Sequence, residues 1–188
     1  MGVEPVYREA ARKLGLILAR EKIRLNYGGG GLGLMGAIAH AAMDAGGEVT
    51  GIIPEFLVAR EHAFEGAREV VVTRDMHERK RIMFERSDAF VTLPGGIGTL
   101  EEVVEQLSWV QLERHRKPIA IVNINGFWNP LLKLFDHLRE RRFLHTARPL
   151  HLVVDRVEDA LPKLREAVHD IPETELHGAA ARVAVQEM

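Results

Sequence analysis

The chain contains no cysteine among its 188 residues. Disulfides, thiolate zinc sites, iron–sulfur clusters and cysteine nucleophiles are therefore excluded. The absence of disulfides fits a reducing compartment, and we predict a cytoplasmic protein. A second absence concerns long apolar runs: no window approaches the ~20 residues of a membrane span, and the charged N-terminus lacks the apolar centre of a signal peptide.

The sequence also lacks an excess of either charge. It carries 25 basic and 27 acidic side chains, a formal charge of −2. This balance argues against a protein that works mainly by neutralising nucleic-acid phosphates or an anionic membrane surface. Nucleic acids and membranes are therefore not expected as partners. With 46% hydrophobic residues, the chain can bury the core of one domain.

Short apolar runs alternate with helical patterns along the chain. The expected strands are 23–27, 48–53, 69–72, 89–93, 119–123 and 150–154. The expected helices are 5–20, 34–45, 76–85, 100–115, 128–142 and 157–168. This alternation predicts an α/β fold with a Rossmann-like, doubly wound parallel sheet flanked by helices. We expect a single nucleotide-binding catalytic domain over 1–170 and a weakly ordered tail over 171–188.

One element of such a fold is not found in the sequence. Open α/β sheets usually begin with a central strand, whereas no apolar strand precedes the helix expected over 5–20. The first strand is therefore expected to be missing. Either the fold tolerates this loss or the natural start lies upstream of Met1.

Seventeen glycines are present, and many fall in two loops. The first loop, 28–36, follows a strand and opens a helix, so its backbone N–H groups can approach an anion. Gly29, Gly30 and Gly33 are the candidate phosphate contacts. Gly31-x-Gly33-x-x-Gly36 fits the dinucleotide pattern by count, but no acidic residue ends the next strand, which argues against NAD.

The second loop, Pro94-Gly95-Gly96-Ile97-Gly98-Thr99, also joins a strand to a helix. Each loop taken alone is equally well explained as a tight turn that needs small residues. Both loops, however, follow parallel strands, whose carboxyl ends share one edge of a sheet. Together they favour a ligand that carries a phosphate.

Arg79 and Lys80 lie on the helix before the second loop. Arg79 projects beside the apolar face, where an arginine usually reaches solvent or pairs with an acid. The functional alternative is an arginine aimed at a phosphate or a leaving base, with Lys80 as an additional positive charge.

Glu102 has two competing explanations. Thr99-x-x-Glu102 ahead of an apolar run is the pattern of a capping box, in which Thr99 caps the helix and Glu102 reaches back. A carboxylate beside a phosphate loop also suits hydrolysis, where it orients water or stabilises a positively charged sugar. The residues alone leave both explanations open.

Metal binding and aromatic stacking have weaker support. The nine histidines show no metal-like clustering, so most are expected at the surface or at helix ends and no metal site is predicted. Trp109 and Trp128 are expected to serve packing or a subunit interface.

Two stretches of this sequence resemble a known family. Arg79-Lys80 and Pro94-Gly95-Gly96-Ile97-Gly98-Thr99-Leu100-Glu101-Glu102 look like the Pro-Gly-Gly-x-Gly-Thr-x-x-Glu proteins often labelled "lysine decarboxylase-like". Members include the LOG enzymes, cytokinin riboside 5′-monophosphate phosphoribohydrolases. Gly28-Gly29-Gly30-x-x-Gly33-Leu34-Met35-Gly36 also matches, and the similarity extends over about 5–164.

The resemblance implies a Rossmann-like homodimer that hydrolyses AMP or N6-prenyl-AMP to free base and ribose 5-phosphate without a cofactor. It places the catalytic pair on Arg79 and Glu102. Together with the glycine loops, it predicts substrate contacts at Gly29, Gly30, Gly33, Glu61, Lys80, Gly95, Gly96, Ile97, Gly98, Thr99, Leu100 and Glu101.

The sequence leaves one alternative function open and argues against another. A nucleotide- or cofactor-binding carrier or sensor, similar to molybdenum-cofactor carriers, has the same fold but would not need the Arg79/Glu102 pair. Amino-acid decarboxylation needs a lysine Schiff base to pyridoxal phosphate. Only Lys80 lies near the expected phosphate loops and no pyridoxal site is recognisable, so this activity is rejected.

Overall fold

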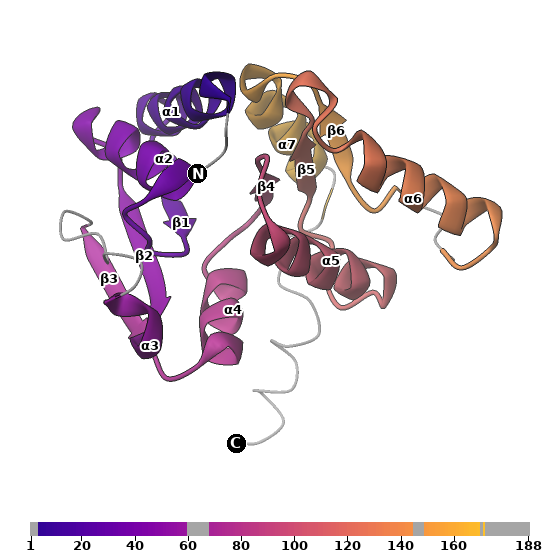
Figure 1. Cartoon of the computed structure of the whole chain (residues 1–188), viewed down its shortest axis with the longest axis horizontal. Coiled ribbons are helices and arrows are strands. Elements are labelled where there is room, and N and C mark those ends of the chain that lie inside the picture. Colours follow the sequence, from indigo (N-terminus) through magenta and orange to yellow (C-terminus); the bar gives the residue numbers. More distant parts are fainter. Residues whose placement is uncertain (1–3, 60–67, 145–148, 170, 172–188) are drawn as a thin grey trace. The chain divides into compact units, whose positions relative to one another are not determined.

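The structure, a computed structural model, describes residues 4–59, 68–144, 149–169 and 171. Helices and parallel strands alternate along it (Figure 1). The strands are β1 (Leu25–Tyr27), β2 (Val49–Pro54), β3 (Glu69–Thr73), β4 (Phe90–Thr92), β5 (Ile119–Val122) and β6 (Leu152–Val154). The helices are α1 (Pro5–Arg20), α2 (Gly33–Asp44), α3 (Glu55–Val58), α4 (Met76–Glu85), α5 (Ile97–Gln111), α6 (Asn129–Glu140) and α7 (Ala160–His169), with 3-10 turns η1 (Ile124–Gly126) and η2 (Val157–Asp159).

The chain divides into two compact units, Met1–Ser87 and Asp88–Met188. In the first unit, β1, β2 and β3 form a parallel sheet with β2 in the centre. Every residue of β2 is buried, so both faces of this strand are covered, because successive side chains point to opposite faces. Helix α2 packs on β1 and β2, and α4 packs on β2 and β3.

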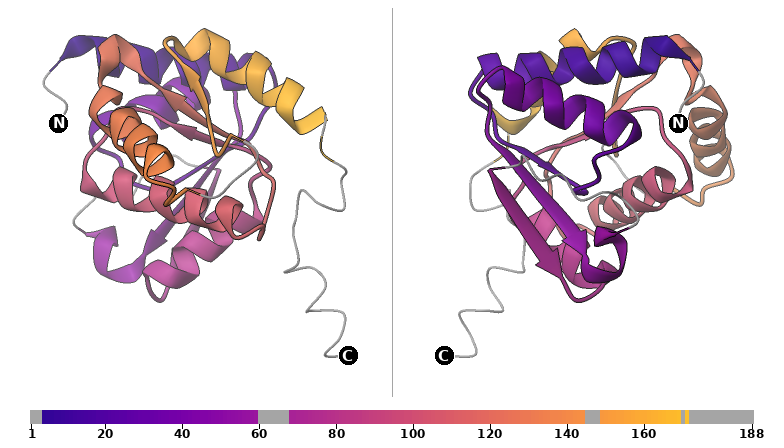
Figure 2. Two further views of the ribbon diagram at one scale, coloured as in Figure 1. Left: turned by 90° about the vertical axis from the view of Figure 1, so that its right-hand side faces the viewer. Right: turned by 60° about the vertical axis from the view of Figure 1, so that its left-hand side comes forward.

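Helices α1 and α2 lie side by side in the first unit (Figure 2). Helix α1 begins with Pro5 in its first turn, where the missing N–H costs nothing. Gly15 makes the close approach possible, since a Cβ at this position would overlap the carbonyl oxygen of Ile38 and lie 2.9 Å from the backbone nitrogen of Ala42. The two helices therefore contact each other through backbone.

The second unit repeats the arrangement with β4, β5 and β6, again parallel and with β5 in the centre. All four residues of β5 are buried, and α7 contacts this strand. A core cluster joins β5 to α5 and α6, and it consists of Val103, Leu107, Ile119, Ile121, Trp128, Phe135 and Leu150.

These observations confirm the predicted α/β class, with parallel strands flanked by helices. Helices α1 and α4 have the predicted bounds, and the six strands were predicted to within two residues at either end. The short helix α3, directly after β2, was not predicted. The tail predicted over 171–188 lies outside the described residues apart from Ile171.

The predicted limits of α5 were wrong at both ends. The helix begins at Ile97 rather than Leu100 and ends at Gln111 rather than His115. It ends there because Glu113 has a φ of 56°, a left-handed conformation. The N–H of Arg114 then donates to the carbonyl of Trp109 at 2.9 Å, as in a helix C-cap.

Candidate active site

The first glycine loop follows β1 and leads into α2. Gly29 has a φ of 78°, and a Cβ there would lie 2.9 Å from the Cβ of Ile53. Gly36 is equally restricted, because a Cβ there would overlap the carbonyl oxygen of Gly31. Gly33 has a φ of 63° and opens α2 after Leu32, which provides no side-chain cap. The loop therefore brings backbone amides of a helix N-terminus to the carboxyl edge of β1, an arrangement suited to an anion.

Helix α4, which carries Arg79 and Lys80, has a strongly fixed start. Asp75 is its N-cap and accepts the backbone N–H of Glu78 at 2.8 Å. Glu78 accepts the backbone N–H of Arg74 at 2.8 Å and pairs with the Arg74 side chain. Hydrogen bonding from that side chain is the main reason why the pKa of Glu78 lies below its ordinary value. These contacts fix the helical turn from which Arg79 projects.

The structure brings Arg79 to the first glycine loop. Its guanidinium occupies the space where a side chain at Gly28 would lie, so that a Cβ there would overlap Nη2 and lie 3.3 Å from Cζ. Nη1 donates to the sulfur of Met76 at 3.6 Å. Arg79 is only 8% exposed, so the alternative in which it extends into solvent is wrong. Lys80 is half-buried.

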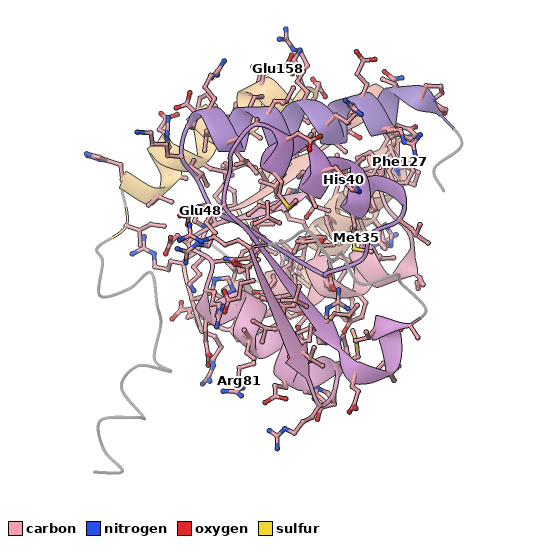
Figure 3. The ribbon with its side chains drawn as sticks, turned by 90° about the vertical axis from the view of Figure 1, so that its left-hand side faces the viewer. Met35, His40, Glu48, Arg81, Phe127 and Glu158 are labelled. Carbon is pink, nitrogen blue, oxygen red and sulfur yellow. The ribbon has the colours of Figure 1, made fainter. Side chains whose placement is uncertain are left out.

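Arg81 shows what an ordinary surface arginine of α4 looks like. Its side chain is 57% exposed and lies 3.8 Å from Glu78 and 3.6 Å from Glu85, one helical turn away on either side. Figure 3 labels it at the periphery of the molecule. Arg81 follows Arg79 by two positions, so the two side chains lie on opposite faces of α4. This explains why Arg81 is exposed and Arg79 is buried.

The second glycine loop leads from β4 into α5. Gly96 is the N-cap of α5, and its carbonyl accepts the N–H of Leu100 at 3.0 Å. Gly96, Ile97 and Gly98 are exposed, and Ile97 is 83% exposed. Because Gly96 and Gly98 have no side chain, their exposure is that of the backbone, at an end of the helix where an anion is favoured. The first turn of α5 contains no acidic residue that would occupy this position.

The capping-box explanation for Thr99 and Glu102 is wrong. Thr99 is the third residue of α5 and not its N-cap. Its side chain folds over Gly95, where an added Cβ would overlap the hydroxyl oxygen and lie 2.7 Å from the Thr99 Cβ. Glu102 lies in the second turn and is half-buried beside the core residue Val103, whereas Glu101 is exposed. The helix start therefore does not require the Glu102 carboxylate.

The structure thus places the predicted residues in two groups. Gly29, Gly30, Gly33, Arg79 and Lys80 belong to the first unit, and the remaining described ones, Gly95, Gly96, Ile97, Gly98, Thr99, Leu100, Glu101 and Glu102, belong to the second. Glu61 lies outside the described residues.

Sequence reasoning missed a polar turn at the carboxyl end of β5. Since β4 and β5 are parallel, this end shares an edge with the second glycine loop. Asn123 is 8% exposed and bonds both Trp128 and Asn129. A φ of 72° at Gly126 completes the turn. The Asn125-Gly126 dipeptide, typical of tight turns, is the signal that could have revealed it.

Most of the described histidines are exposed, as expected, namely His40, His77, His137 and His169, whereas His115 and His151 are not. His115 is 1% exposed, and its Nδ1 accepts the N–H of Lys117 at 3.1 Å. Burial, with a smaller effect of Lys117, lowers the pKa of His115 to about 4. Burial likewise lowers the pKa of the half-buried His151. His115 precedes the amino end of β5, at the opposite edge of the sheet from the second glycine loop.

Neither a metal centre nor a membrane span is found in the described part of the chain. Over those residues, no three His, Asp or Glu side chains are grouped so that they could hold a metal ion. No described helix has the length and apolar character needed to cross a bilayer.

Solved structures with a similar fold include the molybdenum cofactor carrier protein MCP from Chlamydomonas reinhardtii. The similarity has a TM-score of 0.68 at 23% identity and covers 89% of this chain and 91% of the carrier. The molybdenum cofactor binding protein from Rippkaea orientalis gives a TM-score of 0.67 at 21% identity, with 89% and 91% covered. At these identities the likeness is one of fold.

Sequence similarity is much stronger to a group of enzymes. The chain is 43% identical over 161 residues to the cytokinin riboside 5′-monophosphate phosphoribohydrolase of Rhodococcoides fascians, covering 85% of this chain and 81% of that protein. It is 43% identical over 166 residues to the Arabidopsis thaliana enzyme LOG3, covering 88% and 77%. The probable enzyme LOGL2 of Oryza sativa subsp. japonica is 42% identical over 166 residues, covering 88% and 68%.

A family model described as "Possible lysine decarboxylase" also matches residues 35–164, a range that contains Arg79 and the second glycine loop. The chain therefore belongs to the LOG family, whose similar members are cytokinin riboside 5′-monophosphate phosphoribohydrolases.

Proposed function

We propose that this protein hydrolyses the N-glycosidic bond of an N6-substituted adenosine 5′-monophosphate, releasing the free base and ribose 5-phosphate. The observation that carries this proposal is 43% identity to phosphoribohydrolases over 85–88% of the chain. The complete Pro94–Glu102 motif and the buried Arg79 support it, because both suit a phosphorylated ligand.

The proposed reaction begins with capture of the 5′-phosphate at the second glycine loop. The exposed backbone amides at the start of α5, around Gly96 and Gly98, donate to the phosphate oxygens, and the helix dipole adds partial positive charge. Gly29, Gly30, Gly33 and Lys80 provide further contacts with the nucleotide. Binding of the phosphate, remote from the bond that breaks, orients the ribose.

Glu102 and Arg79 are the proposed catalytic pair. The oxygen of a water molecule forms a bond to C1′ as the bond from C1′ to the base breaks, and the departing base keeps the electron pair and takes up a proton. Glu102 orients this water or stabilises the positive charge that develops on the ribose. The guanidinium of Arg79 supports the phosphate or the departing base.

The assay that tests the function is incubation of the purified protein with N6-isopentenyl-AMP and with AMP, followed by chromatography of the free base. Base release that depends on the protein is expected, and Arg79→Ala should reduce kcat/KM at least about 100-fold. Arg81→Ala is the matched control, because it removes the same charge from the exposed face of the same helix. Without base release from the wild-type protein the enzymatic proposal fails, and a thermal shift with AMP would then favour a nucleotide carrier.

We further propose that the protein forms a homodimer through α5. Ile97, Val104 and Leu112 are 83%, 41% and 69% exposed, and they fall on one face of this helix and its C-cap residue, Leu112. Their exposure supports an apolar contact between two copies. Light scattering during gel filtration should give twice the mass of the chain, and Val104→Glu with Leu112→Glu should give the mass of one chain.

A further inference from the structure

We infer that Gly28 and Met76 position Arg79 for the reaction. The space beside Gly28 and Met76 that holds the guanidinium is called the seat of Arg79, and only a residue without a side chain at 28 leaves it open. This inference rests on the proposed function. It concerns how a buried guanidinium on α4 is held against the loop that follows β1, and it gives Gly28 a role other than that of a phosphate-binding glycine.

The need for glycine at position 28 comes from space and not from backbone conformation. Gly29 and Gly33 have φ values of 78° and 63°, where other residues are strained. Gly28 is not among the glycines of positive φ. A Cβ at Gly28 would overlap Nη2 of Arg79 and lie 3.2 Å from the sulfur of Met35. Alanine is therefore acceptable to the backbone at this position and conflicts with the guanidinium.

Two methionines lie beside this space, Met76 and Met35. Met76 is one turn before Arg79 on α4, and its sulfur accepts a hydrogen bond from Nη1 at 3.6 Å. Met35, labelled in Figure 3, lies in the first turn of α2 and approaches the same space at Gly28. A thioether is a weak, polarisable acceptor that carries no charge. The sulfur of Met76 therefore contacts the guanidinium without adding a negative charge.

Burial makes the position of this side chain sensitive to small changes. Arg79 is 8% exposed, so its side chain is packed on most sides. The guanidinium therefore has little room to rotate away from a methyl group at position 28. The guanidinium must move away from the loop, and a displacement of about 1 Å at a catalytic group can cost about 100-fold in rate. Gly28→Ala should therefore act on activity through Arg79.

A double-mutant cycle separates this role from ordinary packing. Gly28→Ala is expected to lower kcat/KM for N6-isopentenyl-AMP by about 10- to 100-fold in the wild-type background. In the Arg79→Ala background it should change kcat/KM less than about twofold, because the group it displaces is already gone. An equal loss in both backgrounds, or full activity of Gly28→Ala, would overturn the inference.

A milder change at Met76 tests the seat if Gly28→Ala fails to fold. Met76→Leu keeps the volume and removes the acceptor, and we expect a several-fold loss of kcat/KM that disappears in the Arg79→Ala background. Met83→Leu makes the same change elsewhere on α4 and should leave kcat/KM within about twofold of wild type. A loss of the same size from Met83→Leu would contradict the role of Met76.

A crystal structure of Gly28→Ala provides a readout that needs no activity. The guanidinium of Arg79 should be displaced from residue 28, while α4 keeps its cap at Asp75. An unmoved guanidinium would refute the seat even if the wild type is active. Conversely, a displaced guanidinium in a protein that releases no base would leave the seat intact and refute only the proposed reaction.

Discussion

The backbone N–H of Trp128 donates to Oδ1 of Asn123 at 2.8 Å, and the Nδ2 group of Asn123 donates to Oδ1 of Asn129 at 2.9 Å. One buried amide side chain thus holds both ends of the turn between β5 and α6. Trp128 in turn belongs to the core cluster that includes Val103 and Leu107 of α5. The turn at the edge of the second glycine loop is therefore connected to the helix that carries Glu102.

Replacing Asn123 with alanine should destabilise the protein. The change leaves the N–H of Trp128 without its acceptor in a buried place, which costs about 1–3 kcal/mol. Urea unfolding followed by tryptophan fluorescence measures the loss. Asn123→Asp, which keeps the acceptor for Trp128, should lose less, and an Asn123→Ala protein as stable as wild type would show that water replaces the amide.

Glu102→Gln should abolish most activity and leave the fold intact. The carboxylate is the proposed catalytic group, and general acid–base or electrostatic assistance contributes about 100-fold or more to kcat. Since Gly96 and not Thr99 caps α5, the start of the helix should persist, and the variant should unfold cooperatively in urea like the wild type.

Glu113→Gln, just beyond the other end of α5, is the control for this substitution, because it removes an exposed carboxylate far along the helix. Its kcat should equal that of the wild type. Full activity in Glu102→Gln would remove this residue from the proposed mechanism.

Tyr27→Phe should be neutral or stabilising at pH 8. The Tyr27 hydroxyl is buried and has no hydrogen-bond partner in the described part of the chain. Burying a polar group without a partner lowers the free energy of unfolding by about 1–3 kcal/mol, and phenylalanine removes that group. Burial also raises the pKa of Tyr27 from 10.0 to about 12. Between these values the unfolded chain loses the proton that the folded chain keeps, so stability falls as pH rises.

Denaturation at pH 8 and pH 11 checks both parts of the Tyr27 prediction. The wild type should lose stability over this interval and the phenylalanine variant should lose less. A Tyr27→Phe protein that is clearly destabilised at pH 8 would indicate that the hydroxyl bonds a buried water molecule.

Acid should destabilise the protein through His115. Its pKa in the folded protein is about 4, against 6.5 for the free side chain. Between pH 6.5 and 4 the unfolded chain therefore binds a proton that the folded chain does not, and the free energy of unfolding decreases as the pH falls. The effect corresponds to about 1.4 kcal/mol for each unit between the two pKa values.

His115→Asn isolates this contribution, because asparagine can still accept the N–H of Lys117 and does not titrate. Urea unfolding at pH 7 and pH 5 should show a smaller loss in the variant than in the wild type. Equal losses would mean that other groups, such as His151, dominate the acid response.

The sequence predicted well those elements whose signal is local. Helix α1 shows a helical repeat at Tyr7, Ala11, Leu14 and Leu18, all buried. Strand β5 is an uninterrupted apolar run because both of its faces are covered. The start of α5 was mispredicted because two local signals competed. Thr99-x-x-Glu102 fits a capping box, but Gly96 caps the helix instead.

The surroundings of Arg79 could not be predicted in the same way. Its helical spacing identified a residue beside the apolar face, whereas its contact with Gly28 joins segments far apart in the chain. The same holds for His115, which is buried and meets the rings of Phe90 and Trp109 edge-on, with ring centroids 6.1 and 6.4 Å away. Such contacts depend on how strands and helices pack, and a single sequence without its fold does not contain that information.

The order of the strands has a consequence for how the protein is made. In each sheet the strands follow one another as they do in the chain, β1-β2-β3 and then β4-β5-β6. Each strand therefore pairs only with the strand before or after it in its own sheet. All strand pairs within Met1–Ser87 can form before the ribosome adds Asp88. Parallel sheets are slow to form when their partners are distant. Here the nascent chain can build each sheet one strand at a time, with few unpaired strands exposed to other chains.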